Sequence, residues 1–154
     1  MKVSDYIAKF LEEKGIKNAY GMSGGAIIHL VDSIYSETNI DITFGTNEQF
    51  SAFEADGDAR ANQCKKPGIC FATSGPGATN LLTGIATSYF DSIPLLVFTG
   101  QVARHRQKGD LGVRQLGFQE LLIVDMAKHI CKETFSPKSV IELPTILNDA
   151  WNKS

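Results

Sequence analysis

The sequence contains few cysteines and no long apolar run. Its 154 residues include three cysteines, Cys64, Cys70 and Cys131, and no C-x-x-C pair, so a disulfide framework or a metal site has no support. No window approaches eighteen uninterrupted apolar residues, so a membrane-spanning helix is not expected. The first residues alternate charged with apolar side chains, unlike a secretory signal peptide. The expected location is a reducing cytoplasm.

Positive charge is not in surplus either. Fifteen Lys and Arg residues stand against seventeen Asp and Glu residues, which gives a formal net charge of -2. Neither nucleic acid nor a membrane surface is therefore an expected partner. With 43% hydrophobic residues the chain can bury one core, so we expect a single domain over residues 1–154 and regard it as a fragment of a longer chain.

The sequence does contain a repeated unit of strand, turn and helix. The first element is an amphipathic helix, indicated by the helical spacing of Val3, Ile7, Phe10 and Leu11, with Ser4 as the expected N-cap and Gly15 as the expected left-handed C-cap. Ser136 and Pro137 are expected to begin a late helix, which Pro144 interrupts before a closing helix. Strands are expected at residues 19–20, 40–44, 68–73 and 94–99, and the first three lead into helices that begin near residues 27, 47 and 78.

Two of the expected strands, at residues 68–73 and 94–99, are apolar on both faces. Parallel strands that are covered by helices on both sides have this pattern. The sequence therefore predicts an α/β fold with a doubly wound parallel sheet and helices on both faces.

Glycine-rich turns between strand and helix also suggest a dinucleotide site. The run from Gly75 to Asn80 supplies the first two glycines of G-x-G-x-x-G, but Asn80 stands at the third. The next strand ends at Phe98-Thr99-Gly100 without an acidic residue for a ribose hydroxyl, and no turn contains the lysine of a P-loop. The dinucleotide interpretation is therefore weak.

A more specific resemblance covers nearly the whole chain. Six blocks, in order, are similar to the N-terminal pyrimidine-binding domain of thiamine-diphosphate-dependent enzymes of the acetolactate synthase type. These blocks are Tyr20-Gly21-Met22-Ser23-Gly24-Gly25-Ala26, Asn47-Glu48-Gln49 with Ala55-Asp56-Gly57-Asp58-Ala59-Arg60, Ala72-Thr73-Ser74-Gly75-Pro76-Gly77-Ala78-Thr79-Asn80, Asp91-Ser92-Ile93-Pro94, Thr99-Gly100-Gln101-Val102, and Phe118-Gln119-Glu120.

The resemblance implies a cofactor and a set of site residues. A carboxylate has to bond N1′ of the cofactor's aminopyrimidine and favour its imino tautomer, and Glu48 matches that carboxylate. Gln119 matches a glutamine near the cofactor and the reacting centre, so Glu48 and Gln119 are the expected catalytic residues. The expected cofactor-binding residues are Gly24, Gly25, Ala26, Glu48, Thr73, Pro76, Asn80 and Gln119.

The resemblance also implies what lies outside this chain. The family binds the diphosphate through Mg²⁺ in a second domain, and no segment here matches those ligands, so no metal ligand is expected within the chain. Because the family places the cofactor between domains of two subunits, we expect a homodimer or higher oligomer. The expected substrate is a small 2-oxo acid such as pyruvate, whose two-carbon unit passes to a carbonyl acceptor.

Several alternatives stay open. Two-chain 2-oxo-acid decarboxylases have a short subunit of this kind, and the chain could also be a non-catalytic Rossmann-like binding module. A glutamate at a helix start can simply complement the helix dipole, and Gln119 can be a solvated loop residue. The family usually has His where Asn47 stands, and this departure leaves the expected role of Glu48 unchanged. The family also usually has proline at Ser23 and an aromatic residue at Asp58, which leaves the acceptor substrate open.

Overall fold

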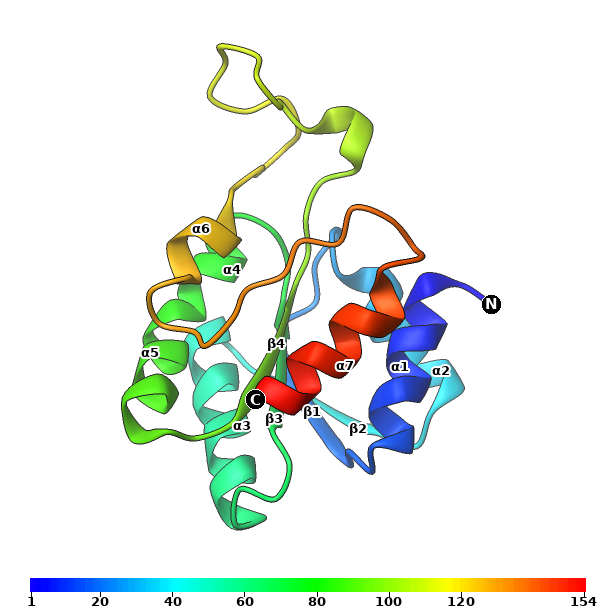
Figure 1. The fold of residues 1–154 in the computed structure, drawn as a ribbon, viewed down its shortest axis with the longest axis vertical. Coiled ribbons are helices and arrows are strands. Elements are labelled where there is room, and N and C mark those ends of the chain that lie inside the picture. The colour runs from blue at the N-terminus through cyan, green and yellow to red at the C-terminus, as the bar shows by residue number, and fades with distance from the viewer.

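Four parallel strands form the centre of the structure, a computed structural model that describes all 154 residues (Figure 1). The strands are β1 (Asn18–Gly21), β2 (Asp41–Phe44), β3 (Gly68–Ala72) and β4 (Leu95–Thr99), in the order β2-β1-β3-β4. Every neighbouring pair is parallel. The chain moves from β1 to one side for β2 and then to the other side for β3. The predicted doubly wound parallel sheet is confirmed.

Helices cover both faces of this sheet, as the apolar strands predicted. On one face lie α1 (Val3–Glu13), α2 (Ile28–Glu37) and α7 (Leu143–Lys153), and on the other lie α3 (Glu48–Ala61), α4 (Pro76–Asn80) and α5 (Leu82–Asp91) (Figure 1). The short η1 (Arg104–Arg106) and α6 (Ile123–Ala127) follow β4. None of these helices has the length and apolar character that a membrane span requires.

Strand β3 shows why two layers form. Its side chains alternate between the faces, so Ile69 and Phe71 join the core under α1 and α2, whereas Cys70 and Ala72 join the core under α3 and α5. All five of its residues are buried. Strand β4 is less covered because it lies at the edge of the sheet, and only Leu96 is buried there.

The ends of α1 agree only in part with the sequence prediction. Gly15 has φ +78° and follows the last turn, as expected for a left-handed C-cap. The predicted N-cap Ser4 is wrong, because the helix begins at Val3 and Lys2, two residues before Ser4, is the N-cap. The Asp5 carboxylate accepts the Lys2 N–H (3.0 Å) and the Ser33 hydroxyl (2.8 Å). A buried partner on α2 thus fixes this end of the helix.

Two later helices also differ from the prediction. The helix expected from residue 78 begins at Pro76 and divides at Leu81 into α4 and α5. No helix begins at Ser136 and Pro137, and Pro144 does not interrupt a helix but lies in the first turn of α7. Proline is favoured in a first turn because the N–H that it lacks has no partner there.

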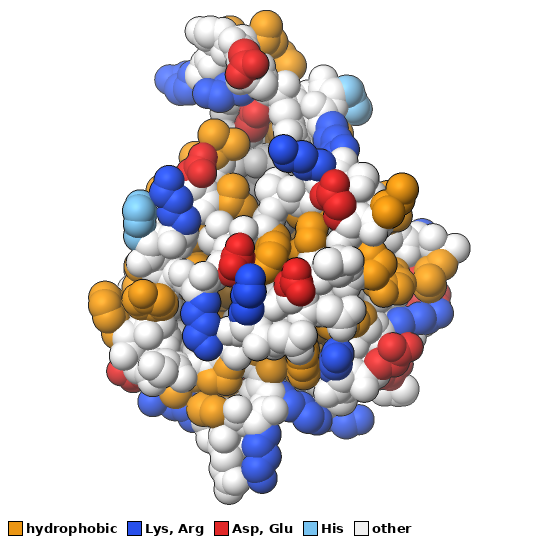
Figure 2. Space-filling view, viewed as in Figure 1, with side chains coloured by type: hydrophobic (Ala, Val, Ile, Leu, Met, Phe, Trp, Pro, Cys, Tyr) orange, Lys and Arg blue, Asp and Glu red, His pale blue; other side chains and the backbone are white.

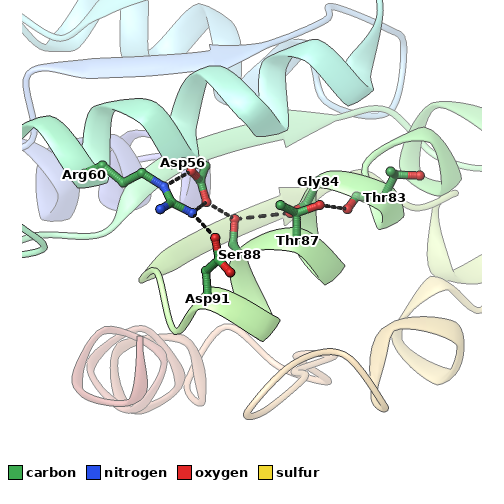
Figure 3. A network of polar contacts seen from close by, with 7 residues as sticks. All are labelled: Asp56, Arg60, Thr83, Gly84, Thr87, Ser88 and Asp91. Carbon is green, nitrogen blue, oxygen red and sulfur yellow. Dashed lines mark hydrogen bonds and ion pairs between the residues drawn. The ribbon is translucent and has the colours of Figure 1, made fainter.

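A polar network joins α3 to α5 on one side of the sheet (Figure 3). Arg60 Nε donates to Asp56 Oδ1 (2.5 Å), and the Ser88 hydroxyl donates to Asp56 Oδ2 (2.7 Å). Arg60 Nη2 also donates to Asp91 Oδ2 (2.6 Å). Burial raises the pKa of Asp56, but the hydrogen bonds from Arg60 and Ser88 outweigh burial and leave the pKa below its ordinary value.

We expect Ser88→Ala to lower the free energy of unfolding by about 1–2 kcal/mol, because the Asp56 carboxylate loses a buried donor. Since the folded pKa of Asp56 is depressed, the charged network stabilises the fold above the unfolded pKa and is lost as the pH falls through the folded pKa. The difference in the free energy of unfolding between Ser88→Ala and the unmodified chain should therefore become smaller in acid. Urea unfolding from pH 7 downwards measures this. Thr87→Ala, which removes an exposed hydroxyl from the same helix, should change stability by less than about 0.5 kcal/mol.

Candidate functional site

The predicted site residues all follow the carboxyl ends of the four strands. Gly24, Gly25 and Ala26 follow β1, and Glu48 follows β2. Thr73, Pro76 and Asn80 follow β3, and Gln119 lies in the long loop after β4. The order β2-β1-β3-β4 reverses direction between β1 and β3. At such a point the neighbouring loops diverge and leave a crevice, where open α/β sheets bind ligands.

Thr73 joins the loop after β1 to the turn after β3. Its Oγ1 accepts the N–H of Ala26 (3.3 Å). A Cβ atom on Gly24 would lie 2.5 Å from Thr73 Cβ, and a Cβ atom on Gly77 would lie 2.8 Å from Thr73 Cγ2. Both positions therefore need glycine to let the backbone approach this side chain. Gly25, by contrast, faces open space.

Glu48 begins α3 and is only 8% exposed. Asn47 is the N-cap of the helix, and its side chain accepts the N–H of Gln49 (2.8 Å). The Glu48 carboxylate accepts the side-chain amide of Asn80 at Oε2 (2.9 Å). Its Oε1 lies 3.0 Å from the position of a Cβ on Gly77 and accepts no hydrogen bond within the chain. One carboxylate oxygen is thus held by the protein, and the other is free to bind a ligand.

Gln119 reaches the same turn through its backbone. Gln119 has φ +57° and Gly75 has φ +60°, and a Cβ on Gly75 would lie 2.7 Å from Gln119 Cβ. A left-handed conformation is uncommon outside glycine, so the close packing on Gly75 holds Gln119 in place. In the turn at residues 75–77, Gly75 therefore packs against Gln119 and Gly77 lies beside Glu48.

The loop that carries Gln119 stands away from the body of the molecule (Figure 1). Gln101 Nε2 donates to the carbonyl oxygen of Leu121 (2.6 Å) and closes the base of the loop. The N–H groups of Leu116 (3.0 Å) and Lys108 (2.8 Å) donate to the Glu120 carboxylate. These bonds, with Leu116 the larger contributor, lower the pKa of Glu120. The loop is therefore fastened by its own polar groups.

The same loop carries both exposed hydrophobic side chains and basic side chains. Figure 2 shows hydrophobic, Lys or Arg, and Asp or Glu side chains together at the projecting end. The exposed hydrophobic residues of the loop are Leu111, Val113, Leu116 and Phe118, and its basic residues are Arg104, Arg106, Lys108 and Arg114.

The structure adds two residues that the sequence analysis did not assign to the site. The capping role of Asn47 could have been predicted, since asparagine directly before a helix is a common N-cap. Ser51, one turn after Glu48, is fully buried and its hydroxyl has no partner. A Cβ on Gly45 would lie 2.5 Å from this hydroxyl oxygen, so Ser51 packs against the segment between β2 and α3.

A large cavity of the chain lies elsewhere. It has a volume of about 910 Å³ and is bounded by β4, residues 130–137 and α7. None of the predicted site residues lines it. It is mainly apolar, and it extends along the strand at the edge of the sheet. Its lining has neither the carboxylate nor the glycine turns of the crevice, so the candidate site is the crevice at the strand ends.

The fold and the crevice belong to a known class of cofactor-binding domain. The family model described as "Thiamine pyrophosphate enzyme, N-terminal TPP binding domain" matches residues 1–128. The chain belongs to this family.

Its relatives include large subunits of acetolactate synthase. The chain is 38% identical over 148 residues to acetolactate synthase isozyme 1 large subunit of Escherichia coli K12. The matched region covers 96% of this chain and 25% of that protein. It is 39% identical over 151 residues to a probable acetolactate synthase large subunit of Methanocaldococcus jannaschii, covering 98% and 24%. The chloroplastic enzyme of Arabidopsis thaliana is 36% identical over 150 residues, covering 97% and 21%. The chain thus spans about a quarter of the length of these relatives.

We expect Asn47→Ala to lower the free energy of unfolding by about 1 kcal/mol, because the N–H of Gln49 loses its capping acceptor. Asn47→Asp should be nearly neutral, since aspartate caps as well as asparagine. Urea unfolding of the two variants beside the unmodified chain measures the difference. Equal stability of the Ala and Asp variants would show that the cap does not stabilise α3.

Proposed function

We propose that this chain is the aminopyrimidine-binding half of a thiamine-diphosphate-dependent enzyme that decarboxylates pyruvate and transfers the two-carbon unit to a carbonyl acceptor. Family membership supports the cofactor, and the acetolactate synthase relatives support the reaction class. The observation that carries the proposal is the Glu48 carboxylate, which is buried beside a glycine turn with Oε1 free of any partner in the chain. Thiamine diphosphate, when bound, supplies the thiazolium centre at which 2-oxo acids are cleaved.

The residues of the crevice fit an aminopyrimidine ring. Gly77 and Gly24 have no side chain where one would press on Thr73, and Gly25 faces open space. A flat ring can approach backbone of this kind closely. In our proposal Glu48 Oε1 bonds the ring at N1′, Pro76 lines the ring, and Gly24, Gly25 and Ala26 border the thiazolium side. In the same proposal Gln119, which the long loop after β4 carries, lies nearest the substrate.

The role of Glu48 in this proposal is to hold a proton at N1′. An ionised carboxylate is a strong acceptor, and a partly buried site strengthens the bond because water competes less. Glu48 is also the first residue of α3, and the N-terminus of a helix interacts favourably with negative charge. Neither Asn80 nor Asn47 carries a charge, so Glu48 is the acidic group that the crevice offers.

We also propose that the complete site requires a second subunit. No group of three or more His, Cys, Asp or Glu side chains is arranged to hold a metal ion, so the Mg²⁺ that holds the diphosphate would be bound by residues outside this chain. Phe50 (55% exposed) and Phe53 (38% exposed) lie on the outer side of α3, and Phe44 (55% exposed) ends β2. These exposed apolar rings on α3 and at the end of β2 support a homodimer or higher oligomer that would cover them.

We expect Glu48→Gln, in an enzyme that joins this chain to its diphosphate-binding domain, to slow exchange of the cofactor C2 proton by at least about a hundredfold. The amide keeps the shape of the side chain but lacks the charge that holds a proton at N1′. Exchange into deuterium oxide, stopped with acid and read by NMR, measures this step directly. Unfolding curves of the two proteins should coincide. An exchange rate equal to that of the unmodified enzyme would refute the assignment of Glu48.

We expect this chain by itself to be inactive towards pyruvate and to bind thiamine diphosphate weakly, because the proposal assigns the ligands of the diphosphate and of Mg²⁺ to residues outside it. Titration calorimetry with and without Mg²⁺ tests this. Tight, Mg²⁺-dependent binding to the chain would contradict the proposal of a half-site. Activity that appears when a separate diphosphate-binding chain is added would favour the short subunit of a two-chain decarboxylase instead.

A further inference from the structure

The side-chain amide of Asn80 is the one donor that the chain gives to the Glu48 carboxylate. Asn80 is the last residue of α4, and its Nδ2 lies 2.9 Å from Glu48 Oε2. It makes no other side-chain hydrogen bond. Although Asn80 is exposed, its amide reaches a carboxylate that is only 8% exposed. The two residues are 32 positions apart in the sequence, so the bond joins two separate helices.

We propose that Asn80 is a positioning residue that acts through Glu48. By binding Oε2 it fixes the rotation of the carboxylate and leaves Oε1 directed at the glycine turn, 3.0 Å from the Cβ position of Gly77. A donor to a carboxylate also favours its ionised form. This inference deepens the proposed function and rests on it. It assigns Asn80 to the control of Glu48, in place of the direct contact with the pyrimidine ring that the family resemblance implies.

The geometry separates the two roles. An amide that touched the ring would contribute to the binding of the cofactor, and its loss would weaken that binding. The loss of an amide that only orients Glu48 would leave cofactor binding nearly unchanged. It would instead change the pH below which C2 exchange is lost. The pH dependence of C2 exchange therefore distinguishes the two roles. A purely structural defect would lower the rate by the same factor at every pH. It would not move the acid limb, which is the pH range in which the rate falls as the solution becomes more acidic.

The first test uses this chain without cofactor and follows the Asn80 side-chain amide by ¹⁵N NMR during acid titration. We expect its signal to move as the neighbouring carboxylate takes up a proton, and this movement should be lost in Glu48→Gln. An Asn80 signal that does not respond to acid in the unmodified chain would overturn the inference. This outcome would leave the proposed function untouched, since it involves neither cofactor nor substrate.

The second test measures C2 exchange against pH in the enzyme that contains the diphosphate-binding domain. We expect Asn80→Ala to move the acid limb to higher pH, because the Glu48 carboxylate loses its one donor within the chain. Asn80→Asp should move it further, because it adds a negative charge beside Glu48. The dissociation constant of thiamine diphosphate should stay within about threefold in Asn80→Ala, as expected for a residue that acts indirectly.

Asn148→Asp is the matched control, because Asn148 is an exposed helical asparagine whose amide donates to the carbonyl oxygen of Pro144 in α7 (2.8 Å). This variant makes the same chemical change as Asn80→Asp without contact to Glu48. It should leave the acid limb of C2 exchange at the same pH. Weaker cofactor binding with an unmoved limb in Asn80→Ala would overturn the inference in favour of a direct contact with the ring. If Glu48→Gln exchanges normally in the same series, the proposed function itself fails.

Discussion

The close packing around Thr73 is the constraint on which the site depends. Its side chain fills the space that side chains on Gly24 and Gly77 would need, and its hydroxyl accepts the N–H of Ala26. The loop after β1 and the turn after β3 are therefore held at a fixed separation at the point where the strand order reverses. Because Gly77 also borders Glu48 Oε1, the position of the carboxylate follows from the same packing.

The polar network of α3 and α5 extends this constraint over the length of the helix. Glu48 and Asp56 lie on α3 eight residues apart, which corresponds to about 12 Å along the helix axis. Asn80 on α4 donates a hydrogen bond to Glu48, and Ser88 on α5 donates one to Asp56. Since α4 and α5 are joined at Leu81, two bonds between the same pair of segments restrict both the tilt and the rotation of α3. The orientation of Glu48 is therefore set by two contacts instead of one.

Local patterns in the sequence were enough to predict the sheet and the places where the strands end. Runs such as residues 94–99 are apolar on both faces, and this property belongs to the segment itself. One error arose where a distant contact decides. The N-cap of α1 moved from Ser4 to Lys2 because Asp5 is held by Ser33 on another helix, and no pattern near residue 4 contains that information. For the site, the resemblance singled out Glu48 and Asn80, but their hydrogen bond depends on how two helices pack.

The two oxygens of the Glu48 carboxylate are not equivalent, and this asymmetry explains how half a site can be ready for a ligand. Oε2 has its donor in Asn80, whereas Oε1 has none within the chain and lies beside a glycine turn. Removal of a carboxylate from water is costly unless hydrogen bonds replace the water. A second donor at Oε1 would complete that replacement, and a ring nitrogen that carries a proton meets this need. Under the proposed function, this arrangement of a single side chain would favour a flat ligand with a protonated ring nitrogen.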